Sequence, residues 1–374
     1  MQKLAIIGAS ILQRPLVEKA KNMKIETHVF AWTEGCAIID IADYFYPISV
    51  TNKEEILKYC RDIGIDGVVS IASDISMPTV NFVAHGLKLV GNSIETSEVT
   101  TNKYLMRQLL IKAGIPCPKF KEYSIPNFDK HDNLKFPIIV KPIDSSGSRG
   151  VTKIEKFKEV NTAIRKALAY SFKKKVIIEE FIEGKEFSVE MISWNGEHYF
   201  LNITDKVTTG APYFVEIEHH QPANISDLLK DKIIRTIKKS LDALNFQNGA
   251  SHSEIIVSKS NKLTIVEIGG RMGGDFIGSN LVELSTGYDY VKGVIEISLG
   301  TFKKPKIRSK AFCGVYFLCK ETEYLMEIFK KFVNTPYIVK AEIYDNQIRE
   351  VQNSSDRSGF IIYNSDKKII FNNI

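Results

Sequence analysis

Residues 252–271 read HSEIIVSKSNKLTIVEIGGR, in which two apolar, β-branched runs flank a polar turn at residues 258–261. This pattern predicts two antiparallel strands joined by the turn. If the chain reverses at Ser260 and Asn261, Glu254 lies opposite Glu267, and because side chains alternate along a strand, both carboxylates share one face. Two facing carboxylates repel each other, and a hard divalent cation, which takes oxygen ligands, relieves the repulsion. The stretch therefore predicts a metal site formed by Glu254 and Glu267.

Arg271 ends this stretch, four residues after Glu267, in a glycine-rich loop where the backbone can approach a ligand closely. A guanidinium group in that place can hold carboxylate or phosphate oxygens. The hairpin alone leaves a second interpretation open, in which one glutamate is exposed to solvent and the other forms a salt bridge with Arg271.

The composition is that of a globular protein with two or three domains. The chain has 374 residues, 44% of them hydrophobic and 25% charged, so neither a disordered nor a fibrous chain is expected. It contains no apolar run of membrane-spanning length and no apolar signal-peptide core, which predicts a cytoplasmic protein with no membrane partner. Its five scattered cysteines form no C-x-x-C pair, which argues against a disulfide framework or a zinc cluster.

The formal net charge of +6 comes mainly from lysines spread along the chain. Nucleic-acid binding would need clustered basic residues interleaved with aromatic residues, and the sequence has no such cluster. We therefore expect no nucleic-acid partner. The mild positive charge favours anionic small molecules, or simply solubility.

The first 100 residues alternate between strands and helices, with strands predicted at 4–8, 27–30 and 67–71 and helices at 12–22, 53–61 and 77–85. Such alternation predicts a parallel, doubly wound sheet. The first turn has one glycine, Gly8, where a dinucleotide site needs G-x-G-x-x-G, so NAD or FAD binding is not expected. Ser73 and Asp74 follow a strand and could line a ligand site at the carboxyl edge of the sheet, although turn or helix-cap chemistry explains them equally well.

The rest of the chain predicts three further units. A helix at 101–113 leads into strands at 137–141, 152–154 and 176–180, and two more strands are expected at 186–193 and 198–207. Residues 208–224 have no periodicity and predict a long loop that carries His219 and His220. Short strands around a helix at 323–332 predict a small closing subdomain. The expected domains are 1–100, 101–190, 191–305 and 306–374.

The strongest local motif is FPIIVKPIDSSGSRGV, residues 136–151. Its apolar strand delivers Lys141, and a glycine- and serine-rich loop follows, comprising Ser145, Ser146, Gly147 and Ser148. Loops of this kind offer N–H groups and hydroxyls to phosphate oxygens, and the lysine adds a point charge. The motif is not a Walker A sequence, and an ordinary hairpin remains an alternative. Lys103, at the start of the preceding helix, could reach the same phosphate or be a solvated charge.

A possible nucleotide-base site follows in VIIEEFIEGKEFSVE, residues 176–190. Here an apolar strand ends in two acids, and the hinge residues that could read an adenine edge are Glu179, Glu180, Phe181 and Ile182. Glu186, seven residues after Glu179, could hold ribose hydroxyls. A charged edge strand with a glycine turn is the alternative interpretation.

These pieces occur together and in order, and the sequence resembles the ATP-grasp superfamily over roughly its first 300 residues. It is most similar to carboxylate–amine ligases that resemble the L-amino-acid (dipeptide) ligases. The stretches that carry the resemblance are GASILQRPLVEKA, SDISMPTVNFVAHGLKLVGN, TTGAPYFVEIEHHQP and EIGGRMGGDFIGSNLVELSTG. The resemblance implies an α/β protein of ATP-grasp architecture, in which an N-terminal doubly wound parallel-sheet domain and two α+β subdomains enclose the nucleotide.

The resemblance also implies roles for the residues named above. Lys103 and Lys141 would contact the α- and β-phosphates of ATP beneath a lid formed by residues 145–150. Residues 179–182 would line the adenine site, and Glu186 would bind ribose. Glu254 and Glu267 would hold Mg²⁺, with Mn²⁺ as an alternative ion, and Arg271 would steady the acylphosphate and the tetrahedral species. One departure is Gly269, which stands where many members have the asparagine of E-x-N-x-R.

The implied reaction joins a small-molecule carboxylate to an amine through an acylphosphate, with Lys141 and Arg271 as the catalytic side chains. The candidate substrate residues are Ser73, Asp74, His220, Gly274 and Asp275, although a helix cap explains Asp275 equally well and a surface position would explain the histidine. A purine-pathway-type carboxylase or ligase acting on a nucleotide precursor is an alternative function, as is a nucleotide-binding protein without turnover. A homodimer is compatible with the sequence.

Overall fold

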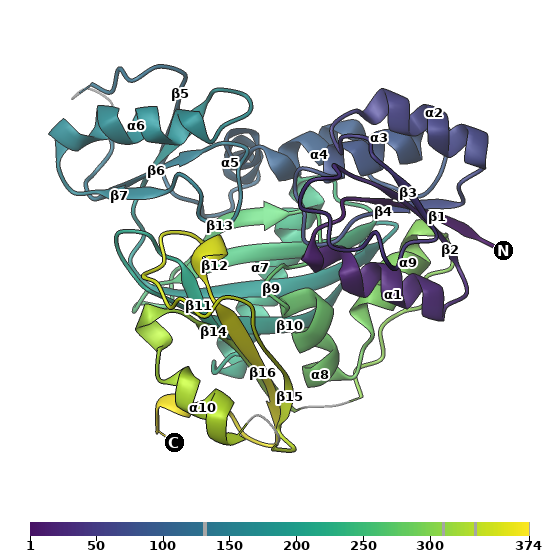
Figure 1. Ribbon diagram of the computed structural model, residues 1–374. Coiled ribbons are helices and arrows are strands. Elements are labelled where there is room, and N and C mark those ends of the chain that lie inside the picture. The colour runs from purple at the N-terminus through teal and green to yellow at the C-terminus, as the bar shows by residue number, and fades with distance from the viewer. Residues whose placement is uncertain (130–132, 309–310, 333–334, 374) are drawn as a thin grey trace.

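The computed structural model describes residues 1–129, 133–308, 311–332 and 335–373, and this part of the chain forms three β-sheets (Figure 1). A parallel sheet contains the N-terminal strands, a small antiparallel sheet carries the glycine- and serine-rich loop, and a large antiparallel sheet lies below both in the view of Figure 1. The site described below lies where the small and large sheets meet.

The N-terminal sheet confirms the predicted doubly wound unit. Its order is β3-β2-β1-β4, all neighbours are parallel, and its strands are β1 (Lys3–Ile7), β2 (Glu26–Phe30), β3 (Tyr44–Tyr46) and β4 (Gly67–Val69). The helices of this unit are α1 (Arg14–Asn22), α2 (Lys53–Ile63), α3 (Met77–Leu87) and α4 (Ile94–Thr101). Strand β3 and helix α4 were not predicted, because YFY is short and IETSEVTT has no apolar stripe.

Helix α9 (Tyr290–Ser298) returns from the C-terminal third of the chain to this N-terminal unit (Figure 1). It packs against α1 and β4, and its Val291, Val294 and Ile295 belong to the same buried core as Leu4 and Ile6 of β1. A parallel sheet is covered on both faces, and α9 supplies part of that cover. The core of the N-terminal unit therefore extends beyond the predicted domain boundary at residue 100.

The small sheet has the order β5-β8-β6-β7 with antiparallel neighbours. Its strands are β5 (Phe120–Tyr123), β6 (Ile138–Pro142), β7 (Thr152–Ile154) and β8 (Val176–Glu180). Helix α5 (Lys103–Lys112) precedes the sheet, and helix α6 (Val160–Ala169) packs on it through Val160, Ile164 and Ala167. The glycine- and serine-rich loop connects β6 to β7 and thus projects from one end of this sheet.

The large sheet has eight strands in the order β13-β12-β9-β10-β11-β14-β16-β15. The strands are β9 (Lys185–Trp194), β10 (Glu197–Thr208), β11 (Glu216–Gln221), β12 (Gly249–Val257), β13 (Leu263–Gly269), β14 (Phe312–Leu318), β15 (Ile338–Ile343) and β16 (Gly359–Ser365). Helix α7 (Asp227–Ala243) covers part of the sheet through Ile233, Ile237 and Leu241. The remaining helical segments are α8 (Val282–Thr286), α10 (Leu325–Phe332), a π-helical turn at Ile277–Leu281 and 3₁₀ turns at Ile11–Gln13, Phe157–Glu159, Lys320–Thr322, Ser354–Asp356 and Phe371–Asn373.

The C-terminal strands differ from the prediction of a separate closing subdomain. Strand β14 pairs with β11, and β16 and β15 continue from it, so these strands extend the large sheet. The sequence showed the strands but not their partner, because the edge of β11 that they pair with is almost 100 residues earlier in the chain.

The predicted loop at residues 208–224 contains the end of one strand and the whole of another. Strand β10 extends to Thr208 and β11 spans Glu216–Gln221, so His219 and His220 lie in a strand and point to opposite faces. The polar side chains of the run EIEHHQ make ion pairs and hydrogen bonds inside the fold. Because the run is polar, the sequence did not predict a strand there. Among the described residues, no helix is both long enough and apolar enough to cross a membrane.

Candidate active site

The hairpin of β12 and β13 has the predicted register. Glu254 lies directly opposite Glu267, and a bulge follows between Glu254 and Ile255. The turn is closed by the Ser258 N–H, which donates to the Lys262 carbonyl at 3.0 Å, and Asn261 adopts the left-handed conformation with φ of 56°. Both glutamates line one cavity, so the expectation that they share a face is confirmed.

This cavity has a volume of about 440 Å³, which suits a small-molecule ligand. The small sheet and the loop after β6 form one wall, and β9, β10, β12 and β13 form the other. The predicted site residues that line it are Lys103, Lys141, Ser145, Ser146, Gly147, Ser148, Glu179, Glu180, Phe181, Ile182, Glu186, Glu254, Glu267 and Arg271. Segments far apart in the sequence thus converge on one cavity.

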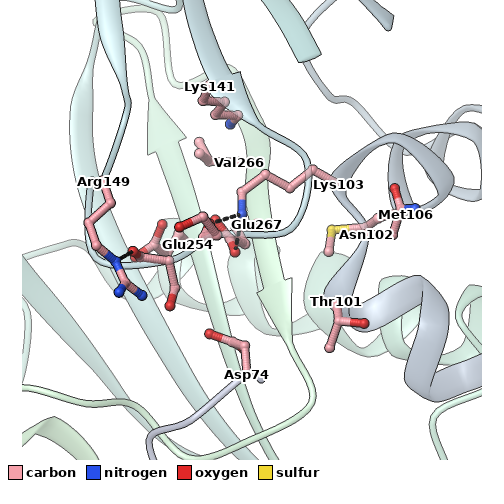
Figure 2. A network of polar contacts seen from close by, with 12 residues as sticks. Asp74, Thr101, Asn102, Lys103, Met106, Lys141, Arg149, Glu254, Val266 and Glu267 are labelled. Carbon is pink, nitrogen blue, oxygen red and sulfur yellow. Dashed lines mark hydrogen bonds and ion pairs between the residues drawn. The ribbon is translucent and has the colours of Figure 1, made fainter. Parts of the chain in front are cut away.

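Lys103 connects the hairpin with the glycine- and serine-rich loop (Figure 2). Asn102 caps helix α5 by accepting from the backbone N–H groups of Tyr104 and Leu105, which places Lys103 at the first turn of the helix. The Lys103 ammonium lies 2.9 Å from Glu267 Oε1 and donates to the Ser145 carbonyl at 2.8 Å. A cation in the first helical turn therefore bridges a predicted metal ligand and the predicted lid.

The loop after β6 contains three residues with left-handed backbone. Gly147, Ser148 and Gly150 have φ values of 67°, 56° and 75°, which glycine adopts without steric cost. Arg149 donates to the Ser146 carbonyl at 3.0 Å (Figure 2). A Cβ atom at Gly147 would lie 3.4 Å from Ser354 Oγ, so the tip of the loop reaches the turn that precedes β16.

Glu254 is held by Lys206, a residue that the sequence analysis missed. The Lys206 ammonium lies 2.8 Å from Glu254 Oε1, 2.5 Å from Glu186 Oε1 and 3.3 Å from Glu216 Oε1. Burial alone would lower the pKa of Lys206, but the three carboxylates, Glu186 first, hold it well above its usual value. Burial alone would raise the pKa of Glu254, and Lys206 holds it well below its usual value. In the sequence, Lys206 reads as the polar end of a strand, and only the fold surrounds it with carboxylates.

Glu179 is the centre of a buried ion cluster. Arg107 Nε lies 2.7 Å from Glu179 Oε1, and Lys141 Nζ lies 2.7 Å from Glu179 Oε2. Arg107 also donates to the Val266 carbonyl on β13. Burial alone would raise the pKa of Glu179, but Arg107 and Lys141 together hold it below its usual value, while burial lowers the pKa of Lys141. The Glu179 carboxylate is therefore committed to two cations, while the residue itself lines the cavity as predicted.

Arg107 was also missed by the sequence analysis. It is completely buried, although its place in YLMRQLL would suit a solvated helix face. Its helix neighbours Met106 and Leu110 are buried, so this face of α5 is turned inward and Arg107 goes with it. A buried arginine needs an acid, and Glu179 is that acid.

The hinge after β8 approaches the hairpin closely. Gly184 packs against β12, where a Cβ atom would lie 2.4 Å from the Val257 carbonyl oxygen, so only glycine fits. The Phe181 ring lies 6.1 Å from the Phe214 ring, and Lys153 Nζ lies 4.4 Å above it. The Phe181 N–H already donates to the Pro137 carbonyl. The hinge therefore offers the cavity an aromatic and aliphatic lining through Phe181 and Ile182.

Arg271 is paired with Asp74 from the N-terminal unit. The contact is bidentate, with Nε to Oδ1 at 3.0 Å and Nη2 to Oδ2 at 2.9 Å. Burial would raise the pKa of Asp74, and Arg271 lowers it; burial would lower the pKa of Arg271, and Asp74 raises it. The two predicted site residues thus meet, and their contact joins the first sheet to the loop after the hairpin.

Gly269 leaves room for this ion pair. A Cβ atom at position 269 would lie 3.0 Å from Asp74 Oδ1 and 3.3 Å from Arg271 Cζ. An asparagine there, as in the E-x-N-x-R pattern, would press on both side chains. The glycine therefore accommodates a contact between domains at the place where the resembled family has an amide.

His252 lines the cavity beside Glu254, and its Nδ1 is hydrogen-bonded to Glu190 Oε1. Its Nε2 lies 3.5 Å from Glu254 Oε1. Burial alone would lower the pKa of His252, but the Glu190 carboxylate raises it to about 9. His252 and Glu190 were not singled out from the sequence, since a lone histidine in a strand carries no pattern.

The remaining substrate candidates lie outside the lining of this cavity. Asp275 forms a bidentate pair with Arg357, at 2.9 and 3.0 Å, and Arg357 lowers its pKa against the effect of burial. It is therefore an ion-pair partner, and the helix-cap alternative is wrong. Ser73 Oγ lies 2.8 Å from Ser76 Oγ, and Gly274 packs near Ala72 and Leu12.

His220 does not face the cavity. Its ring is buried, with Nδ1 3.0 Å from the Tyr363 hydroxyl and Nε2 2.9 Å from Glu218 Oε2. The histidine on the other face of β11 is His219, whose Nε2 lies 3.7 Å from Asp275 Oδ2. The choice of His220 from the sequence is thus corrected by the alternation of side chains along the strand.

Comparison with known proteins agrees with this geometry. Residues 134–279 match the ATP-grasp domain family. The chain is 27% identical over 270 residues to alanine–anticapsin ligase of Bacillus subtilis (strain 168), an alignment that covers 63% of this chain and 57% of that protein. It is 25% identical over 261 residues to formate-dependent phosphoribosylglycinamide formyltransferase of Prochlorococcus marinus subsp. pastoris, covering 65% of this chain and 64% of that protein. The chain thus spans less than two thirds of the length of either relative.

A solved structure has the same fold. The L-amino acid ligase from Bacillus licheniformis aligns with a TM-score of 0.82 and 22% identity, covering 98% of this chain and 94% of that one. The matched family region contains Lys141, the loop after β6, Glu254, Glu267 and Arg271, which line the cavity together. Residues 134–279 therefore match the ATP-grasp domain family, and the chain has the fold of the L-amino acid ligase.

Proposed function

We propose that this protein is an ATP-dependent carboxylate–amine ligase that forms an amide bond through an acylphosphate intermediate. The observation that carries the proposal is the pair Glu254 and Glu267, directly opposite each other in a cavity that also receives Lys103, Lys206 and Arg271. Two carboxylates ringed by cations suit the metal-bridged triphosphate of a nucleotide. The aromatic and aliphatic hinge at Phe181 and Ile182 suits the base, and Glu186 suits ribose.

The residues present fit a magnesium ion. Glu254 and Glu267 offer the hard oxygen ligands that Mg²⁺ prefers, and each is held by a lysine, Lys206 and Lys103 respectively. Mg²⁺, when bound, would neutralise charge on the phosphate oxygens of ATP. The two lysines could then turn from the carboxylates to the phosphates, because one ammonium serves either kind of oxygen.

The proposed reaction has two displacement steps. An oxygen of the substrate carboxylate attacks the γ-phosphorus of ATP, the bond from that phosphorus to the bridging oxygen breaks, and ADP leaves. The amine nitrogen then attacks the acyl carbon, the bond to the phosphate oxygen breaks with its electron pair, and the amine loses a proton. Lys141 and Arg271 act here as fixed positive charges on the transferring group and on the tetrahedral oxyanion. Closure of the loop at residues 145–150 would keep water from the acylphosphate.

The acceptor amine is proposed to approach from the side of Asp275. This residue follows Arg271 by four positions, and its side chain is 27% exposed, although Arg357 holds both carboxylate oxygens. A partly exposed carboxylate close in sequence to Arg271 favours a cationic amine. The Asp275→Ala variant should change the preference among amines more than the affinity for ATP, and an unchanged preference over a panel of amines would remove Asp275 from this role.

A single assay distinguishes this function from two others, a purine-pathway reaction and nucleotide binding without turnover. Purified protein is incubated with ATP, Mg²⁺ and panels of amino acids, other small acids and amines, and ribonucleotide precursors, while ADP and phosphate release are followed and products are identified by mass spectrometry. Release that needs both an acid and an amine supports the proposal. Release only with a ribonucleotide precursor would favour a purine-pathway reaction, for which the similarity to phosphoribosylglycinamide formyltransferase speaks. Nucleotide binding without release on every panel would favour a protein without turnover.

A further inference from the structure

A buried acid–histidine pair joins β9 to β12, the strand that carries Glu254. Glu190 on β9 and His252 on β12 are directly opposite in the strand register, and Glu190 is completely buried. One Glu190 oxygen, Oε1, is hydrogen-bonded to His252 Nδ1, and the other, Oε2, accepts the Gly273 N–H at 3.0 Å. The two oxygens of one carboxylate therefore fasten a strand side chain and a loop backbone at the same time.

His252 also contacts Glu254, the proposed metal ligand on the same strand. It precedes Glu254 by two residues, so both side chains lie on the cavity face of β12. Its Nε2 lies 3.5 Å from Glu254 Oε1, the oxygen that also faces Lys206 at 2.8 Å. A chain of contacts thus runs from the Gly273 backbone through Glu190 and His252 to one oxygen of a proposed metal ligand.

Gly273 is fitted to this arrangement. A Cβ atom at position 273 would lie 2.6 Å from Glu190 Oε1 and 2.7 Å from His252 Nδ1, closer than real Cβ atoms approach such atoms. Any larger residue would force the acid and the histidine apart. Gly273 is two residues beyond Arg271, so the same pair also fixes the loop that carries the guanidinium.

We propose that Glu190 and His252 are positioning residues that hold the Glu254 carboxylate and the Arg271 loop in one fixed arrangement for the metal-bound nucleotide. The inference rests on the proposed function, because it concerns the same metal and nucleotide. Groups that orient the ligands of a metal are worth about 10- to 100-fold in metal affinity. The pair should therefore affect the hold on the metal far more than the hold on the nucleotide.

The test measures Mn²⁺ binding to the protein with ADP, by electron paramagnetic resonance of the free ion, in the wild type and in Glu190→Gln and His252→Asn. We expect each variant to bind Mn²⁺ roughly 10- to 100-fold more weakly. The affinity for ADP without metal, from calorimetry, should stay close to that of the wild type. Because the two residues act through one contact chain, the double variant should lose little more than either single variant.

The matched control is His198→Asn. His198 is as buried as His252, each being 6% exposed, and it pairs with Asp242 at 3.1 Å and Ser193 at 2.7 Å, outside the lining of the cavity. It should lower the melting temperature without weakening Mn²⁺ binding. Wild-type Mn²⁺ affinity in Glu190→Gln and His252→Asn, or an equal loss in His198→Asn, would overturn the inference.

Gly273→Ala is a second variant that keeps both side chains and tests the same arrangement by crowding it. It should weaken Mn²⁺ binding as the other two do, and it serves if either of them does not fold. Full Mn²⁺ affinity in a folded Gly273→Ala protein would also count against the inference. If the wild type binds ADP but holds no Mn²⁺ with it, the proposed function fails, and the inference fails with it.

Discussion

Two clusters of glutamates and cationic side chains lie on either side of the cavity, and their glutamates differ in exposure. In one, Glu179 is 4% exposed and is held by Arg107 and Lys141, which are 0% and 7% exposed. In the other, Glu254 and Glu267 are 23% and 20% exposed and are each held by a lysine. A buried carboxylate cannot lose its partner without leaving an uncompensated charge, whereas a carboxylate open to a cavity can exchange a lysine for an incoming cation. Burial thus separates an acid committed to ion pairs from the acids proposed to bind a metal, where residue type does not.

The largest expected effect is on the open cluster. Glu267→Gln should reduce ATP-dependent turnover at least about a thousandfold, equivalent to about 4 kcal/mol, because one of the two proposed metal ligands loses its charge. The free energy of unfolding should change little, since Glu267 is partly exposed. Turnover is measured as ADP release with the substrates found in the panel assay, and Glu98→Gln, in an exposed pair with Lys173, is the control. Turnover close to that of the wild type would remove Glu267 from the metal site.

In the buried cluster, substitution should reduce the stability of the protein. Glu179→Gln should lower the free energy of unfolding by about 3 kcal/mol, near the lower end of the cost of breaking a buried ion pair, because glutamine can still accept one hydrogen bond. Urea unfolding followed by circular dichroism measures the change. An unfolding free energy within about 1 kcal/mol of the wild type would mean that the Arg107 contact contributes no more than a surface pair, and the comparison would break.

A smaller effect on turnover is expected from a substitution at Gly269, which lies against the Asp74–Arg271 ion pair. Gly269→Asn should displace the Asp74–Arg271 pair and lower turnover roughly tenfold or more, since a small misplacement of a catalytic group is costly. Gly300→Asn is a control at a glycine remote from the pair. If Gly269→Asn instead raises metal affinity without loss of turnover, Gly269 would only mark a missing metal ligand and would not be needed to accommodate the ion pair.

The smallest effect is a pH dependence of stability. Burial alone would raise the pKa of Asp74, but Arg271, with Lys103 and His252, holds it below its usual 3.8. The contribution of Asp74 to stability is therefore present above about pH 4 and is lost as the pH falls through the lowered pKa. Asp74→Asn should remove this dependence and cost about 1 kcal/mol near neutral pH. Urea unfolding from pH 3 to pH 7 tests the prediction. An equal fall of the unfolding free energy between pH 7 and pH 3 in the wild type and the variant would contradict the prediction.

Part of the site was readable from the sequence because it depends on short-range order. The hairpin register, the strand that delivers Lys141 and the parallel N-terminal sheet follow from alternation and periodicity within some 20 residues, and the structure confirms them. The resemblance to ATP-grasp proteins rested on the same local motifs. The error at His220 arose because β11 is a polar strand without an apolar pattern. The error in the C-terminal strands arose because their partner, β11, lies far away in the sequence.

The amino-acid sequence by itself determined that Glu254 and Glu267 face each other, because a tight turn and the period of a strand leave little choice. Only the tertiary structure decided which cations meet the acids. Arg107 and Glu179 are 72 residues apart, Asp74 and Arg271 are 197 apart, and Lys206 and Glu254 are 48 apart. Charged side chains carry no periodicity that names a distant partner, so their pairing follows from which faces the packed sheets and helices turn inward.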